Sequence, residues 1–308
     1  MQKADQLSVT RVVHSKKIKH STGERVFDTC NIVVLLALCF VTMYPMYYVI
    51  CASFSNNVKL LMNPGFLPWP LGWNLGAYRL AFTHPLLVSG YKNIMIVLLG
   101  GLPINMALTL CCGFFLASKD VLFKKPILAA IMFTMFFSAG MIPNYLNVRS
   151  LKLADTLWAL ILPGAMSVYN SIICKTAIEA VPDSLTESAH LDGANDFLIL
   201  FRIILPLIMP TVAVLLLYYG VAHWNSWFNA TLYITDDKKM PIQNILRAVL
   251  IANSSVFNAA VTENDRINDF AETIKYAAIV ITTVPVLLVY PFLQRYFVKG
   301  VLIGAVKG

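Results

Sequence analysis

The sequence is short of charge. Only 13% of its 308 residues are Asp, Glu, Lys or Arg, whereas 58% are hydrophobic. Soluble domains typically carry about a quarter charged residues, and the deficit here is concentrated in long apolar runs. Burying so many runs in one water-soluble core would be far harder than placing them in lipid. The composition therefore excludes a soluble enzyme and indicates an integral membrane protein.

Several chemical motifs are also missing. There is no G-x-x-x-x-G-K-[ST] phosphate loop and no Gly-Lys pair, so we expect this chain to bind no ATP. The five histidines are scattered, and neither a Cys/His cluster nor a G-x-S-x-G motif is present. The six cysteines lie in or beside apolar runs, where they are expected to act as small core residues. We expect no catalysis, no metal site and no cofactor bound by this chain.

Six segments are long and apolar enough to cross a bilayer, which takes about 20 residues. Eight prolines lie in these runs or at their edges, where neighbouring helices in a membrane bundle can satisfy the freed carbonyls. The sequence therefore predicts an all-α membrane protein with six transmembrane helices, at 27–52, 90–117, 126–147, 156–174, 204–223 and 274–297.

The basic residues predict the orientation of these spans. Fourteen Lys and Arg fall in the N-terminal arm, the second and fourth loops and the C-terminal tail, against eight on the other side. Since basic residues favour the cytoplasmic side, we expect both termini to be cytoplasmic. The net charge of +8 is thus explained by membrane topology, and no nucleic-acid partner is expected.

The predicted organisation has three parts. A basic cytoplasmic arm covers 1–26, the six-helix transmembrane domain covers 27–298, and a cytoplasmic tail covers 299–308. Two outer loops are long: 53–89 is rich in Pro and Trp, and 224–273 contains a helical pattern at 242–252. Either loop can be explained as a partner contact or as a lid packed on the bundle, and for 53–89 the lid is favoured.

The cytoplasmic loop at 176–203 is the most informative segment. Pro182-Asp183-Ser184 marks a helix start, and Ser184 followed by Glu187 matches a capping box. This pattern predicts a short helix from about Leu185 to Asp192. Gly193 is suited to the left-handed residue that ends it. A second helix is expected to begin near Asn195 and to bend near Pro206 and Pro210.

The same loop carries an unusual charge. Residues 175–202 contain five acids but only two basic residues, Lys175 and Arg202. The acids are Glu179, Asp183, Glu187, Asp192 and Asp196. Anionic lipid heads would repel such a loop, whereas a protein partner with a basic groove would attract it. The alternative is a solvated loop whose acids lie at helix N-termini, where the helix dipole favours them.

These residues resemble a known family. The runs Glu187-Ser188-Ala189, Asp192-Gly193-Ala194 and Ile204-Leu205-Pro206 resemble the EAA loop of ABC importer permeases, with Ser188 in place of the first alanine. The whole chain beyond residue 25 is similar to maltose-type carbohydrate-uptake permeases, in a branch that includes complex-polysaccharide and oligosaccharide permeases. Supporting pieces are Lys92-Asn93, the 140–143 and 153–156 segments, Trp224-Asn225-Ser226-Trp227 and the ending from Pro291 to Gly308.

The resemblance implies a type I ABC importer transmembrane domain with a cytoplasmic coupling helix. That helix would dock in a cleft of an ATPase subunit, with Glu187 facing a basic residue and Gly193 as the elbow. The residues implied in ATPase coupling are Ser184, Glu187, Ser188, Ala189, Asp192, Gly193, Ala194 and Pro206. By the same analogy Lys307 and Gly308 in the tail would reach toward the ATPase, unless they form only a frayed terminus.

The resemblance also implies partners and a location. The chain would be a multi-pass protein of the cell membrane, working with a second and different permease subunit, two ATPases that use ATP and Mg, an extracytoplasmic solute-binding protein and membrane lipid. Its function would be to form half of the translocation path for an oligosaccharide or related carbohydrate, by ATP-driven alternating access.

Candidates for the translocation path are polar and aromatic, because sugars bind hydroxyl, amide and aromatic groups. They are Asn93, Asn105, Asn144, Tyr145, Tyr169, Asn170, Tyr218, Tyr219, Trp224 and Asn225. Each can equally be explained as packing between helices or as an interfacial anchor. Two other functions stay open: import of a non-sugar solute, and a non-transporting scaffold. A secondary carrier is disfavoured, because the spans hold almost no charged residues.

Overall fold

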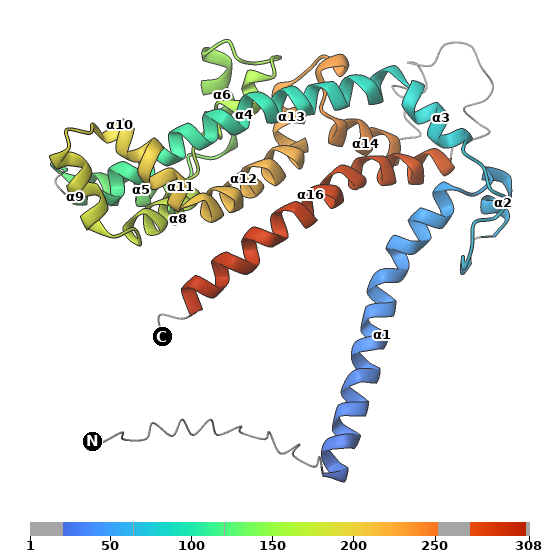
Figure 1. The fold of residues 1–308 in the computed structure, drawn as a ribbon. Helices are drawn as coiled ribbons and strands as arrows, with labels where there is room; N and C mark the ends of the chain where they lie inside the picture. The colour runs from blue at the N-terminus through green and yellow to red at the C-terminus, as the bar shows by residue number, and fades with distance from the viewer. Residues whose placement is uncertain (1–20, 64, 120, 252–271, 306–308) are drawn as a thin grey trace, which may run out of the picture. The chain divides into compact units, whose positions relative to one another are not determined.

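The computed structural model describes residues 21–63, 65–119, 121–251 and 272–305, and these residues contain helices and no β strand (Figure 1). The chain forms two compact units, residues 1–48 and residues 49–308. The helices are α1 Thr22–Ser53, α2 Asn57–Met62, α3 Gly76–Thr83, α4 Pro85–Ala117, α5 Lys124–Phe136, α6 Met141–Ser150, α7 Trp158–Ile161, α8 Val168–Glu179, α9 Asp183–Leu191, α10 Asp196–Leu198, the π-helix η1 Ile199–Ile204, α11 Leu205–Leu207, α12 Met209–Trp224, α13 Trp227–Tyr233, the 3-10 turn η2 Asp237–Lys239, α14 Ile242–Ile251 and α16 Thr273–Ala305.

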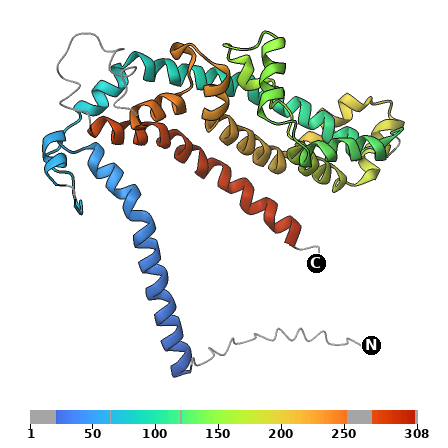
Figure 2. The ribbon, with the colours of Figure 1, turned by 180° about the vertical axis from the view of Figure 1, so that it is seen from behind.

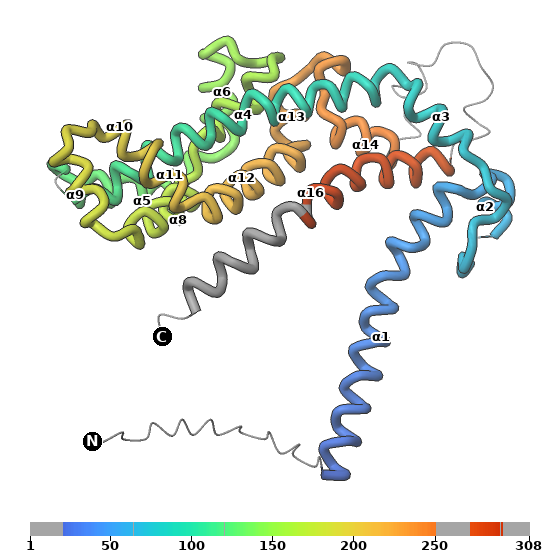
Figure 3. Tube along the Cα trace, in the orientation of Figure 1, coloured from blue at the N-terminus to red at the C-terminus, as the bar shows by residue number. Residues whose placement is uncertain are grey.

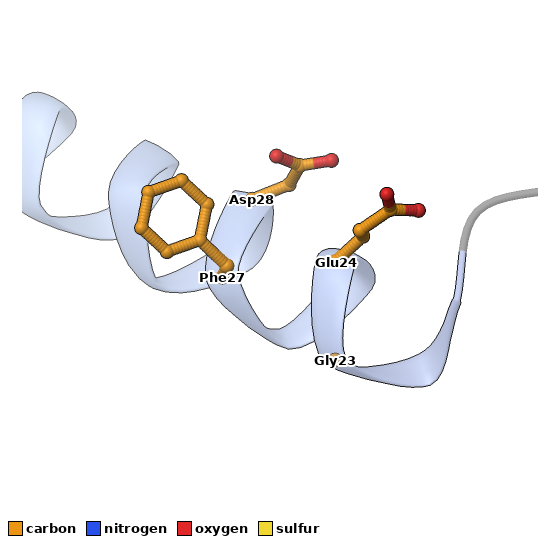
Figure 4. A pocket seen from close by; sticks show the side chains of 4 residues that line it. All are labelled: Gly23, Glu24, Phe27 and Asp28. Carbon is orange, nitrogen blue, oxygen red and sulfur yellow. The ribbon is translucent and has the colours of Figure 1, made fainter.

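The first unit consists mainly of α1, a long apolar helix. Its N-terminal end is capped by the Glu24 side chain, whose Oε2 accepts a hydrogen bond from the Ser21 amide at 2.8 Å. Figure 4 shows a shallow, open pocket on this helix. It is lined by Gly23, Glu24, Phe27 and Asp28. Residues 22–43 are all exposed, so the apolar surface of α1 needs lipid or another chain to cover it.

The second unit is organised around α4. This helix packs against α8 and α12, and also against α3, α7 and α14. One hydrophobic cluster surrounds its first half and includes residues of α14 and α16, and a second surrounds its other half with residues of α8, η1 and α12. In Figures 1 and 2, α4, α12 and α16 run alongside one another. Thus α4 is a shared wall of both clusters.

Each of the six predicted segments is mainly helical in the structure. In the described part of the chain two helices, α1 and α4, are long and apolar enough to cross a bilayer, and up to four qualify if each bent pair counts as one span. The described apolar part of α16, Thr273–Val289, is shorter. Six spans therefore remain a prediction.

Three predicted spans are not continuous helices, and one of them, 204–223, has its break at Ile208, between α11 and α12. The segment at 126–147 is divided into α5 and α6, which meet at an angle of 111° after Gly140, whose φ is +91°. The segment at 156–174 is divided into α7 and α8 by an irregular stretch at 162–167 that contains Pro163 and Gly164. Apolar composition alone does not reveal where a helix stops, although Pro163, one of the prolines noted in these runs, lies at the break in 156–174.

Close packing of α4 on α8 depends on a glycine. A Cβ placed on Gly113 would meet Cys174 Sγ at 2.7 Å and Cys174 Cβ at 2.9 Å. Cys174 itself is fully buried, and all six cysteines are free thiols. The predicted role of a small core residue is therefore confirmed for Cys174.

The two long loops pack onto the second unit. Within 53–89, Leu67 is fully buried and α3 packs against α4 and α16, which agrees with a lid on the bundle. The helical pattern predicted at 242–252 is confirmed by α14, whose residues Ile242, Ile245 and Val249 are buried on one face. Residues 252–271 of the second loop lie outside the described residues.

Candidate functional site

The candidate coupling helix is α9, which begins earlier than predicted. It starts at Asp183, with Pro182 as the N-cap, and no side chain caps its first turn. Ser184 is therefore already inside the helix, and the predicted capping box between Ser184 and Glu187 was wrong. The Ser188 hydroxyl is used locally, since it donates to the carbonyl of Ser184 at 2.6 Å.

The end of α9 forms a Schellman motif, as the sequence predicted. Gly193 has φ +83°, its amide donates to the His190 carbonyl at 3.0 Å, and the Ala194 amide donates to the Ala189 carbonyl at 2.9 Å. These are the two hydrogen bonds that define this helix end. A Cβ on Gly193 would meet nothing within 4 Å, so glycine is required here by the backbone and not by crowding.

The two faces of α9 differ. Glu187 is exposed, while Ala189 and Ala194 are partly buried and pack against the hydrophobic cluster around α8, η1 and α12. The small alanines thus let α9 lie close to its own bundle. As Figure 3 shows, α9 lies at one end of the bundle and α14 at the other.

The acids of this loop are not equivalent. Three have basic partners: Asp183 pairs with Lys119, Glu179 with Lys175 at 2.7 Å, and His190 Nε2 lies 3.7 Å from Asp196. Among the described residues, Glu187 and Asp192 make no side-chain hydrogen bond or ion pair. Their charges are therefore available to a partner. The Lys119 contact also brings the loop between α4 and α5 to the start of α9.

The segment after the elbow descends into the bundle. Asn195 caps it, because its Oδ1 accepts the Leu198 amide at 2.9 Å. A π-helical turn at Ile199–Ile204 precedes Pro206, and residues 196–207 meet α12 at an angle of 89°. Proline removes a backbone donor and π-turns accommodate the change in register. The second helix near Asn195 and the bend near Pro206 and Pro210 are both confirmed.

A buried polar cluster satisfies the broken stretch at 162–167. Asn105 Nδ2 donates to the Ala165 carbonyl at 2.8 Å, and its Oδ1 lies 2.8 Å from His223 Nε2. The Tyr219 hydroxyl accepts the Ser167 amide at 2.9 Å and lies 2.6 Å from Thr109 Oγ1. Irregular backbone at membrane depth needs such partners, since unsatisfied groups in hydrocarbon cost several kcal/mol. Asn105 and Tyr219 were predicted as candidates for the translocation path or for packing between helices, and their partners here lie far along the chain.

The residues predicted for the translocation path are scattered. Asn93 is buried and donates to the carbonyls of Lys238 and Met240, at 2.8 and 3.1 Å. Trp224 is buried and packs on Tyr91 with 6.4 Å between ring centroids. The remaining residues do not gather at one place: Asn144 and Asn225 are exposed, Tyr145 stacks on Tyr233, Asn170 is buried, and Tyr218 is 40% exposed. No single sugar site results, and a role in transport stays a prediction for each.

At the other end of the bundle, Asp155 joins two loops. Its Oδ1 accepts the amides of Thr235 and Asp236 at 3.0 and 3.1 Å, and its Oδ2 lies 2.8 Å from Lys239 Nζ. The bond with Lys239 and the two backbone amides lower the pKa of Asp155 to about 2. The role of Asp155 could not be predicted from sequence, because its partners lie about 80 residues further along the chain.

We expect Asp155→Asn to loosen this joint. The lowered pKa means that the carboxylate stabilises the fold above its unfolded pKa, and that this contribution is lost as pH falls from about 4 toward 2. Because the Asp155–Lys239 pair is partly exposed, the effect is modest: amides 235–240 should exchange with deuterium roughly threefold faster at neutral pH. Asp237→Asn, at an exposed neighbour, is the control. Equal exchange in both variants would contradict the role of Asp155.

The fold and this site together define a class of protein. Exposed apolar helices and helix breaks satisfied by buried polar groups are features of a helical membrane protein. Among the described residues no group of His, Cys, Asp and Glu is placed to hold a metal ion.

The chain belongs to the family described as "Binding-protein-dependent transport system inner membrane component", whose family pattern matches residues 19–303. It is therefore an inner membrane subunit of a transporter and not an enzyme. This confirms the resemblance of the chain to binding-protein-dependent ABC importer permeases.

Individual relatives agree with this assignment. The chain is 39% identical to "Polygalacturonan/rhamnogalacturonan transport system permease protein YtcP" of Bacillus subtilis, over 92% of this chain and 99% of that protein. It is also 39% identical to "Protein LplC" of the same organism, over 94% and 98%. A chain in the crystal structure of "a bacterial ABC transporter involved in the import of the acidic polysaccharide alginate" matches with a TM-score of 0.83 and 28% identity, over 90% of this chain and 99% of that one. The fold is therefore that of a type I ABC importer permease.

Proposed function

We propose that the chain forms half of the translocation path of an ABC importer for an oligosaccharide or related carbohydrate, by ATP-driven alternating access. The observation that carries this proposal is α9, with its exposed Glu187 and its fixed elbow at Gly193. The carbohydrate cargo is supported by relatives that are described as permeases or importers for polysaccharides.

In this proposal α9 is the coupling helix. It docks in a cleft of an ATPase subunit, and Glu187 faces a basic residue there. Asp192 adds a second negative charge, and Ser184 and Ser188 lie on the helix itself. Ala189, Ala194 and Pro206 determine how the helix packs on the segment that follows the elbow. Lys307 and Gly308, which we propose as a further contact, lie outside the described residues.

The proposed assembly holds a second, different permease subunit, two ATPases and an extracytoplasmic solute-binding protein. ATP and Mg are used by the ATPases, and this chain binds no cofactor. Six spans, with both termini in the cytoplasm, place α9 on the cytoplasmic side. Two contacts support this sidedness: Lys119 meets Asp183 at one end of the bundle, and Asp155 meets Lys239 at the other. Each contact joins loops that the charge distribution assigns to the same side.

The test is to purify the tagged chain from native membranes in mild detergent and to identify what accompanies it by mass spectrometry. We expect an ATPase, a second permease and a sugar-type binding protein. Recovery of the chain alone across several detergents would contradict the proposal and favour a secondary carrier or a scaffold. A binding protein for another kind of solute would keep the architecture and change the cargo.

A further inference from the structure

A single charge stands on α13 and α14, the two short helices after α12. Among the residues of both helices, Arg247 is the only charged one. It lies on α14 opposite the buried face formed by Ile242, Ile245 and Val249, and it is exposed. No described residue forms an ion pair with it. Within the described part of the chain Arg247 is thus an exposed cation without an acidic partner, and its charge is available to bind an anion.

The guanidinium of Arg247 lies over an aromatic ring. Its guanidinium carbon lies 4.1 Å from the centroid of Trp227, a cation–π contact between α14 and α13. Trp227 is 39% exposed, and Phe228 meets it edge-on with 5.7 Å between centroids. Among the described residues, no group accepts a hydrogen bond from the Arg247 guanidinium and no acid pairs with it. Its N–H donors are therefore unused within that part of the chain.

The two helices that carry this pair are fixed to each other. Asn244, one turn before Arg247, donates from Nδ2 to the Trp227 carbonyl and to Thr231 Oγ1, both at 2.9 Å. The opposite face of α14 is buried in the hydrophobic cluster around the first half of α4. Trp227 and Arg247 are thus on rigid elements, which lowers the entropic cost of binding a ligand there.

We propose that Arg247, stacked on Trp227, binds the carboxylate groups of an acidic oligosaccharide at the extracytoplasmic entrance of the importer. A guanidinium edge matches a carboxylate with two parallel hydrogen bonds. This inference rests on the proposed function and adds the substrate class and a residue that selects it. Two of the similar proteins handle acidic polymers by their descriptions, a galacturonan and alginate.

The test compares trigalacturonate, which carries free carboxylates, with its fully methyl-esterified form, which carries none. The complete importer, purified through this chain, is reconstituted in vesicles with its binding protein, and uptake of each probe is measured. Arg247→Gln should lower uptake of trigalacturonate roughly tenfold and leave uptake of the ester unchanged. Arg247→Lys, which keeps the charge but loses the fork, should fall between. Arg149→Gln is the control, because it removes an exposed charge from the same predicted side without an aromatic partner.

The outcomes are distinct. Equal loss for both probes in Arg247→Gln would assign Arg247 to packing or to contact with a partner protein and overturn the inference. Unchanged uptake of both, or a loss as large in Arg149→Gln, would overturn it as well. A wild-type complex that imports neither probe would refute the acidic substrate class. The proposed function fails only if ATPase and binding-protein subunits are also missing from that complex.

Discussion

Glu187→Lys should abolish coupling to the ATPase while leaving the permease folded. Glu187 makes no side-chain bond within the described chain, so reversing its charge removes nothing from the fold. At a docking cleft, truncating or reversing one partner of a buried charge pair costs about 2–5 kcal/mol or more. We therefore expect co-purification of the ATPase to fall roughly 30-fold or more, with transport lost and membrane insertion intact.

The control for this result is Asp237→Lys, which makes the same change of charge at an exposed acid on the other end of the bundle. It should leave ATPase association unchanged. If Glu187→Lys assembles and transports like the wild type, Glu187 does not dock. If both variants lose the ATPase equally, the effect comes from net charge and not from the place of α9.

Gly193→Val should give the second large effect. Gly193 has φ +83° and an open surrounding, and a Cβ added there would have nothing within 4 Å, so only the backbone resists a side chain. A β-branched residue in this region costs at least about 1–2 kcal/mol. The cost is relieved by opening the Schellman turn, which would release Ala194 and tilt α9 away from its seat. ATPase association and coupled transport should fall together.

Gly193→Asn provides the matched comparison, since asparagine tolerates the left-handed region. It should retain most of the ATPase association measured by co-purification. Similar results for valine and asparagine would refute the elbow geometry. The comparison is sharp because crowding is absent at this position, and the two variants therefore differ mainly in backbone preference.

Local features of the loop at 176–203 were largely predictable from sequence. Gly193 and Asn195 act through their own backbone and their nearest neighbours, so a short stretch of sequence defines them. The same reasoning failed at Ser184 and Glu187. The Ser-x-x-Glu pattern occurs also at Ser21 and Glu24, where Glu24 does accept the Ser21 amide. At the second place Pro182 is the N-cap, so Ser184 lies too far into the helix to cap it.

Features that depend on distant partners could not be predicted in this way. Apolar composition indicated 156–174 as a span but did not show that it breaks at 162–167, although Pro163 and Gly164 mark the place. The break is stabilised by Asn105 and Tyr219, which come from other helices. Arg247 was only one of several outer basic residues until the structure placed it on Trp227. In each case the role of a side chain depends on a contact with a residue that is remote in sequence.

The polar side chains of α4 have a consequence for biogenesis. Asn105, Thr109 and Asn93 are paired in the finished protein with groups that lie 60, 110 and 145 residues further along the chain. A ribosome adds roughly 5–20 residues per second, so the nascent α4 waits from several seconds to about half a minute for these partners. During this interval its amides and hydroxyl must stay near water or be shielded by another protein. The polar groups of α4 therefore find their final partners only after the C-terminal half of the chain has been made.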